Sequence, residues 1–231
     1  MLAVAGIGGA TLLRRSLSAK ADSGRFYALT AGLAGTWTAS ALLTTAVPVW
    51  PAGRKSLVAE VARPALTGAT TFALFYAAAA IARRHPFAHR AIAGVLRYVD
   101  EGTTPAVLLT ASVNAVAEEL FFRGALWEAA GEDPIAGTVL AYSAVTAGAG
   151  NPALAVGAAI TGVIFGRERA RSGGVAAPVI AHLTWSALML TCLPPLFRPS
   201  AQVRPMLATE GSARASLASG INLESTARFY D

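Results

Sequence analysis

Residues 106–127 read AVLLTASVNAVAEELFFRGALW, an apolar run long enough to cross a bilayer that nevertheless contains three charged residues. A membrane-spanning helix needs about 20 predominantly apolar residues. Each charge at bilayer depth costs about 2.5–3.5 kcal/mol, so Glu118, Glu119 and Arg123 need a compensating environment or a use. The stretch therefore predicts a membrane helix that carries a polar site.

Apolar runs on both sides of this stretch predict an all-α fold, a polytopic transmembrane helix bundle with about six to seven membrane segments. The chain is 54% hydrophobic and 14% charged, with a mean hydropathy of +0.51, which is more apolar than soluble domains usually are. The other predicted segments are residues 26–49, 64–82 and 175–193, a short first helix within 2–13, and a hairpin of 135–149 and 153–165 around Gly150-Asn151-Pro152. Because small residues favour close helix contacts in membranes, we place the hairpin inside the bundle.

Three parts of the chain are predicted. Residues 1–25 form a short N-terminal hydrophobic segment and a basic linker, and residues 26–194 form the transmembrane bundle, with its core at 104–194. Residues 195–231 form a polar C-terminal tail, whose composition is typical of loosely ordered, solvent-exposed chain.

The net charge of +6 favours contact with a lipid bilayer over contact with nucleic acid. The basic residues cluster in predicted connections beside the spans, where anionic headgroups lie. They are Arg83, Arg84, His85, His89 and Arg90 in one connection, and Arg167, Arg169 and Arg171 in another. These two connections fall on opposite membrane faces, so the membrane orientation stays open. An alanine-rich composition with more Arg than Lys indicates a high-GC bacterial genome and hence the bacterial plasma membrane.

The single cysteine, Cys192, excludes an intramolecular disulfide and any site with several cysteine ligands. The chain also has no Gly-rich phosphate loop, no His-Glu-x-x-His pair and no Gly-x-Ser-x-Gly elbow. These absences narrow the chemistry that the chain can perform.

The spacing of the three charges separates one carboxylate from the other two groups. Glu119 and Arg123 are four residues apart, so they share a helix face and can neutralise each other. Glu118 lies about 100° around the helix, beside Asn114, without a full counter-charge of its own. Such a carboxylate can take a proton from water, as a general base must. The alternative is an ion-pair lock between helices, with Glu118 facing a headgroup.

His182 lies in the last apolar run, and Ser186 follows it on the same helix face. An imidazole in hydrocarbon must find a partner, which makes it a functional candidate. We expect Glu118 and His182 to be partners across the bundle. The alternative is a histidine bonded to a neighbouring backbone carbonyl or to Ser186.

Together these residues resemble the CPBP family of intramembrane proteases, which contains the CAAX prenyl endopeptidases and bacterial bacteriocin-processing or immunity proteins. The resemblance rests on Glu118-Glu119-x-x-x-Arg123, on His182 about 60 residues later, and on the Gly-rich segment that ends at Gly166. It covers residues 104–194.

The resemblance implies a role for each motif residue. Glu118 is the expected water-activating base, accompanied by Glu119, with Arg123 as an orienting partner. His182 and Ser186 match a motif that would stabilise the oxyanion, with Ser186 in place of the family's Asn. A further motif, aromatic-x-x-x-His, falls on Tyr142 to Thr146, so Thr146 replaces its histidine and is expected to help hold the oxyanion.

A zinc site usually has three protein ligands and a water, and only Glu118, Glu119 and His182 remain at membrane depth. We therefore expect no cofactor and a metal-free mechanism, with a divalent metal such as zinc as the open alternative. The predicted function is an intramembrane endopeptidase that hydrolyses a bond of a membrane-associated peptide or protein. The alternative is a catalytically weak or inactive family member that acts as a membrane binding, scaffold or immunity-type protein. The Gly- and Ala-rich faces suit contacts within and between chains equally, so they do not define an oligomer.

Overall fold

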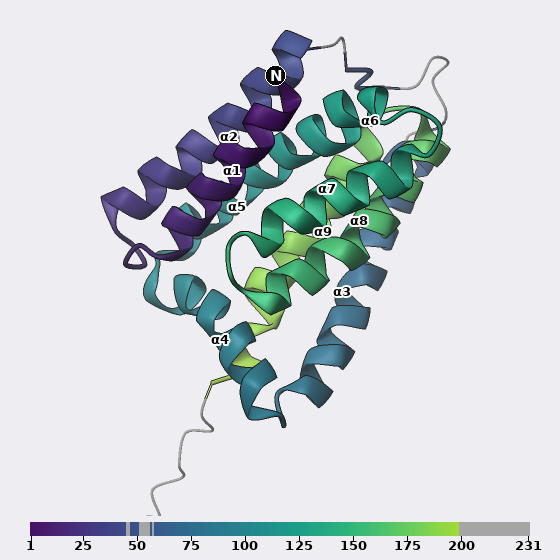
Figure 1. The fold of residues 1–231 in the computed structure, drawn as a ribbon. Helices are drawn as coiled ribbons and strands as arrows, with labels where there is room; N and C mark the ends of the chain where they lie inside the picture. Colours follow the sequence, from purple (N-terminus) through teal and green to yellow (C-terminus); the bar gives the residue numbers. More distant parts are fainter. Residues whose placement is uncertain (45–46, 51–55, 57, 199–231) are drawn as a thin grey trace, which may run out of the picture. The chain divides into compact units, whose positions relative to one another are not determined.

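The computed structural model describes residues 1–44, 47–50, 56 and 58–198, and every secondary-structure element in these ranges is a helix (Figure 1). The elements are α1 (Leu2–Leu17), α2 (Gly24–Thr44), η1 (Val58–Ala62), α3 (Arg63–Ala82), α4 (Pro86–Glu101), α5 (Thr104–Glu119), η2 (Leu120–Ala125), α6 (Leu126–Ala129), α7 (Pro134–Ala147), α8 (Pro152–Ser172), α9 (Ala176–Cys192) and η3 (Pro194–Leu196). Met1–Phe197 form one compact unit. The predicted all-α fold is confirmed for this part of the chain. Beyond Arg198, the predicted polar tail lies outside the described residues.

Local sequence signals explain where many of these helices begin and end. Helices α3, α4, α5, α7 and α8 carry a proline in the first turn, where no intrahelical bond needs its missing amide hydrogen. The side chains of Asp133 and Asn151 also accept backbone hydrogen bonds at the starts of α7 and α8. Gly173 ends α8 with a φ of 77°, a left-handed conformation that glycine adopts without strain.

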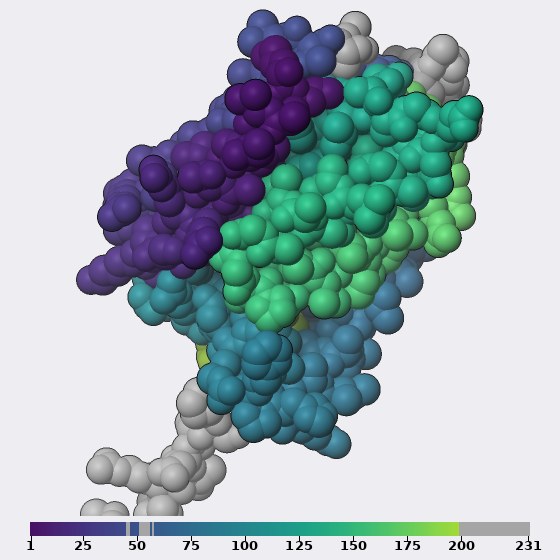
Figure 2. All heavy atoms as spheres, viewed as in Figure 1, coloured from purple at the N-terminus to yellow at the C-terminus, as the bar shows by residue number. Residues whose placement is uncertain are grey.

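Helix α5 packs against α2 on one side and against α9 on the other. Helix α3 packs on α9, while α7 and α8 form a hairpin that also contacts α1 and α9. Figure 2 shows α1 and this hairpin side by side on one face of the unit. The helices that carry the predicted carboxylates and the predicted histidine, α5 and α9, are therefore direct neighbours.

An aromatic core supports the segment that follows α5. The ring of Trp37, which is 1% exposed, lies 4.5 Å from that of Phe121 and 5.3 Å from that of Phe122, measured between centroids. Helix α1 comes close to this cluster at Gly9, where a Cβ would lie 2.0 Å from the Trp37 ring. These contacts hold η2 against α2 and α2 against α1.

Several boundaries differ from the sequence prediction. Helix α2 ends at Thr44, before the predicted limit at residue 49, and residues 48 and 49 instead accept hydrogen bonds from the backbone at the start of α9. Helix α4 lies where the sequence predicts a basic connection, because its charges mask an amphipathic pattern. Helix α8 continues to Ser172, so Arg167, Arg169 and Arg171 lie in a helix and not in a loop.

Two helical stretches of the described chain are long and apolar enough to cross a membrane, Val58–Ala82 and Thr104–Ala129. The second contains the charged stretch. Large apolar side chains are exposed on the outer faces of several helices, among them Leu43 on α2, Leu109 on α5 and Leu140 on α7. Exposed apolar surface of this kind suits contact with lipid. On the α7–α8 hairpin it also shows that one face of the hairpin lies outside the packed interior.

Candidate active site

The charged stretch lies where α5 changes into the π-helical segment η2. The amide of Leu126 donates to the carbonyl of Phe121, five residues earlier, which is the π-helical pattern. A π-turn within an α-helix shifts the faces that later side chains occupy, and such turns are frequent at functional sites. Glu118 and Glu119 precede this shift, and Arg123 lies inside it.

Glu119, Arg123 and His182 form a buried ionic cluster between α5, η2 and α9. Glu119 Oε1 accepts a hydrogen bond from Arg123 Nη1 at 3.1 Å and lies 2.8 Å from His182 Nδ1. The three residues are only 0%, 1% and 5% exposed. The predicted pair of Glu119 with Arg123 is therefore present. The direct partner of His182 is Glu119, however, and not Glu118, because the two carboxylates point to different neighbouring helices.

Glu118 points toward α7. Its Oε2 accepts a hydrogen bond from the Tyr142 hydroxyl at 2.7 Å. The ring of Tyr142 in turn lies under the Arg123 guanidinium, 4.8 Å from ring centroid to Cζ. Tyr142 was placed in a motif by the sequence but was not predicted to contact a carboxylate. The aromatic position of that motif is the signal that could have identified it.

Glu118 and His182 both line a cavity of about 590 Å³. Its walls come mainly from α3, α4, α8 and α9, and they are largely apolar. Tyr142, Thr146 and Trp185 lie with the two titratable residues along its lining. The predicted partners across the bundle therefore share one cavity, although no direct bond joins them.

The two residues that replace family motif residues, Thr146 and Ser186, differ in their position relative to the cavity. Thr146 lines the cavity, but its hydroxyl donates to the Tyr142 carbonyl at 2.8 Å, so this proton is used within α7. Ser186 is half-buried one turn after His182, and within the described chain the cavity lining contains Trp185 and not Ser186. The roles predicted for Thr146 and Ser186 remain predictions.

Several buried polar atoms around the cluster have no hydrogen-bond partner among the described residues. They include Glu119 Oε2, Arg123 Nε, Asn114 Oδ1 and Trp185 Nε1. Buried polar atoms are normally satisfied by protein or by water. Their concentration around one cluster marks this region as able to bind water or a polar ligand group.

The donor set does not fit a zinc ion. In the described part of the chain there is no group of three His, Cys, Asp or Glu side chains that could hold a metal. Oε1 of Glu119 is already engaged by Arg123 and by His182. Glu119 therefore has no free oxygen on this side for a metal ion.

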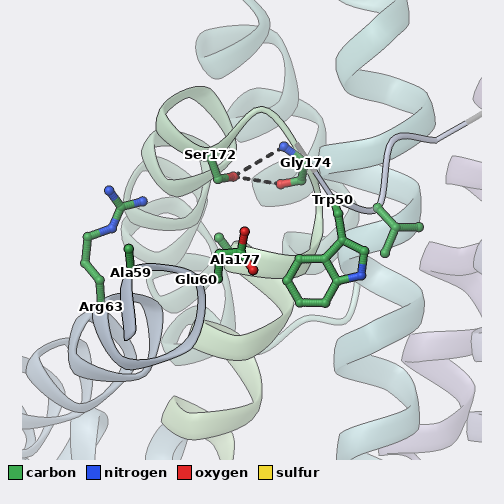
Figure 3. A pocket seen from close by; sticks show the side chains of 8 residues that line it. Trp50, Ala59, Glu60, Arg63, Ser172, Gly174 and Ala177 are labelled. Atoms are coloured by element: carbon green, nitrogen blue, oxygen red, sulfur yellow. Dashed lines mark hydrogen bonds between the residues drawn. The ribbon is translucent and has the colours of Figure 1, made fainter. Parts of the chain in front are cut away.

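A second, small pocket of about 30 Å³ lies beside the start of α9, where Trp50, Arg63 and Gly174 form part of its wall (Figure 3). Ser172 closes the adjacent turn by hydrogen bonds with the backbone of Gly174. A space of this size accommodates water but not a peptide segment. None of the predicted site residues lines it.

Comparison with known families identifies residues 100–188 as matching the family described as "Type II CAAX prenyl endopeptidase Rce1-like". The matched region contains all six predicted site residues. Over these residues the match confirms the resemblance to the CPBP family that the motifs indicated. The family is membrane-embedded and comprises CAAX-type intramembrane proteases that act on membrane peptides. Searches of curated proteins and of solved structures give no significant match.

Proposed function

We propose that this protein is an intramembrane endopeptidase in which Glu118 activates water and His182 stabilises the oxyanion. The observation that carries the proposal is the shared cavity: a carboxylate from α5 and an imidazole from α9 line the same space of about 590 Å³. We further propose a multi-pass protein of about six to seven membrane segments in the bacterial plasma membrane. Helices α3 and α5 with their extensions are the segments that support this topology most directly.

Glu118 has the environment of a general base. The Tyr142 hydroxyl binds Oε2 and orients the carboxylate, which leaves Oε1 for a water molecule. Ionised Glu118 takes a proton from this water while the water oxygen attacks the carbonyl carbon of the peptide bond. The protonated carboxyl then donates that proton to the leaving nitrogen as the C–N bond breaks. The products are one free carboxyl group and one free amine.

His182 is oriented by Glu119, which occupies Nδ1 and leaves Nε2 for the substrate. A protonated ring then donates from Nε2 to the oxyanion of the tetrahedral intermediate. In this state Glu118 is protonated and neutral, so the oxyanion and Glu119 carry the two negative charges, and Arg123 and His182 carry two positive charges. A cluster of zero net charge is the arrangement that a low-dielectric interior tolerates best.

The apolar walls of the cavity support an apolar peptide segment as the substrate. Leu74, Phe75, Ile92 and Trp185 are among the side chains that such a segment would meet. An apolar lining lowers the local dielectric constant, which strengthens the electrostatic interactions at the reacting carbonyl.

One observation favours the alternative, a catalytically weak or inactive member that binds a membrane partner or acts as a scaffold or immunity-type protein. Thr146 occupies the position of the second-motif histidine, and its hydroxyl already donates to the Tyr142 carbonyl. The site then has fewer donors for an oxyanion than the family motif implies. If this loss limits the rate, Thr146→His is expected to raise hydrolysis, whereas a binding protein would gain none.

The decisive experiment compares wild-type protein, Glu118→Gln and Glu132→Gln in membranes that contain a library of apolar peptides. Glu132 is an exposed carboxylate in the turn before α7, so it serves as the matched control. Hydrolysis is expected in the wild type and in Glu132→Gln, and it should be lost in Glu118→Gln. Equal processing by all three proteins would eliminate Glu118 as the base. Binding without cleavage in all three would favour the alternative function.

A further inference from the structure

The guanidinium of Arg169 is buried near the end of α8, against the π-helical segment that follows the catalytic carboxylates. Its Nε donates to the carbonyl of Arg123 at 2.8 Å, and its Nη2 donates to Glu128 Oε1 at 2.7 Å. The residue is 5% exposed, and its Cζ lies 5.5 Å from the centroid of the Trp127 ring. Arg169 thus binds η2 and α6 at once.

These contacts are specific enough to compensate the cost of burying a cation. An isolated buried charge is strongly unfavourable, but one with a counter-ion and hydrogen bonds is tolerated. Glu128 supplies the counter-charge at the rim, where its side chain is 44% exposed. The Arg123 carbonyl accepts at the buried end. Arginine can make both bonds together because its donors lie in a rigid fork.

Arg123, whose backbone Arg169 binds, connects the two halves of the active site. Its Nη1 binds Glu119, which in turn binds His182. Its guanidinium also covers the ring of Tyr142, whose hydroxyl binds Glu118. The position of the Arg123 backbone therefore affects the orientation of both the base and the imidazole.

Helix α8 carries a continuous buried face along this part of the protein. Thr161, Phe165 and Arg169 are spaced four residues apart and are 2%, 0% and 5% exposed. Thr161 lines the cavity, and the Phe165 ring packs on His182 at 5.1 Å between centroids. The same face of one helix thus contacts the cavity, the imidazole and the π-turn.

We propose that Arg169 is a positioning residue that fixes the register of η2, and through Arg123 the geometry of the Glu118 and His182 site. Its relevance to catalysis rests on the proposed endopeptidase function, whereas its effect on η2 does not. A cation that only neutralised Glu128 would need no bond to the Arg123 carbonyl. The inference therefore predicts a local effect on residues 120–126 as well as an effect on turnover.

The test uses the full-length protein in lipid nanodiscs and compares Arg169→Met, Arg169→Lys and Glu128→Gln. The matched control is Arg171→Met, because Arg171 lies two residues further along α8, has a side chain that is 65% exposed, and pairs with Glu168 at 3.6 Å. Hydrogen–deuterium exchange is measured over residues 120–126, with α9 as an internal reference for global stability. The kcat and KM values are measured on a peptide that the wild type cleaves.

Arg169→Met is expected to increase exchange in residues 120–126 at least about tenfold and to lower kcat by a similar factor with KM nearly unchanged, as loss of a charged hydrogen bond would. Arg169→Lys should recover part of both losses. Arg171→Met should behave as wild type. If Arg169→Met does not fold, Arg169→Lys and Glu128→Gln provide the same comparison with a smaller expected change.

Wild-type exchange in residues 120–126 in every folded variant would overturn the inference. So would a kcat loss in Arg171→Met equal to that of the Arg169 variants. A wild type that cleaves no peptide would refute the proposed function instead, and the exchange measurement alone would then decide the role of Arg169.

Discussion

Replacing Gly68 with alanine is expected to separate α3 from α9 beside His182, the histidine proposed for the active site. A Cβ at this position would lie 2.3 Å from the Ala181 carbonyl oxygen and 2.9 Å from Thr184 Cβ. The first of these atoms belongs to the backbone and cannot rotate away. Ordinary contact begins at 3.4 Å, so the two helices must move apart by about 1 Å.

The cost of this movement can be estimated for both stability and activity. Overpacking of a tight contact typically destabilises a protein by about 1–3 kcal/mol. Ala181 directly precedes His182, whose Nδ1 lies 2.8 Å from Glu119. A displacement of about 1 Å would take this pair out of hydrogen-bond range. Misplacement on that scale is expected to slow catalysis by about a hundredfold.

Thermal denaturation in detergent and initial rates of peptide hydrolysis measure the two effects. The matched control is Gly35→Ala in α2, where an added Cβ would meet no atom within 4 Å. That variant should keep wild-type activity and gain stability, since alanine favours a helix over glycine by about 1 kcal/mol. If Gly68→Ala kept both the melting temperature and the rate of the wild type, the close approach of α3 to α9 would be wrong.

Two further substitutions test the ionic cluster. Tyr142→Phe removes only the hydroxyl that binds Glu118, so kcat is expected to fall by about tenfold to a hundredfold at an unchanged melting temperature. An unaltered kcat would show that this hydrogen bond does not orient the base. Glu119→Gln leaves Arg123 buried without its counter-charge, which should lower the free energy of unfolding by about 3–5 kcal/mol. In thermal denaturation Glu118→Gln is expected to lose much less stability than Glu119→Gln. Equal losses of stability in the two variants would contradict the assignment of the structural ion pair to Glu119.

Much of the fold could be predicted because apolar runs and turn residues act locally. The hairpin is an example: Asn151 and Pro152 define the start of α8 through a capping side chain and a first-turn proline. The sequence does not predict helix α4, and the reason is also local. Its basic residues suggested a loop, although helical spacing also gives it an apolar face that lines the cavity.

The charged residues near the end of α8 predict a connection, whereas the structure has a helix there. Arg167, Arg169 and Arg171 were assigned together to a connection, yet Arg169 is buried while Arg171 is exposed. Alternate residues on a helix end face opposite directions, and only the neighbours decide which one is buried. Here the neighbours are the Arg123 carbonyl and Glu128, which lie more than 40 residues away in the chain.

The sequence by itself determined the helical class, the charged stretch and the pairing of Glu119 with Arg123, because each depends on spacing within one helix. Tertiary structure decided that His182 bonds to Glu119, that Tyr142 binds Glu118, and that Glu118, Tyr142 and His182 line one cavity. The physical reason is that a carboxylate has no preferred partner until packing brings one within about 3 Å, and helix rotation selects among several candidates.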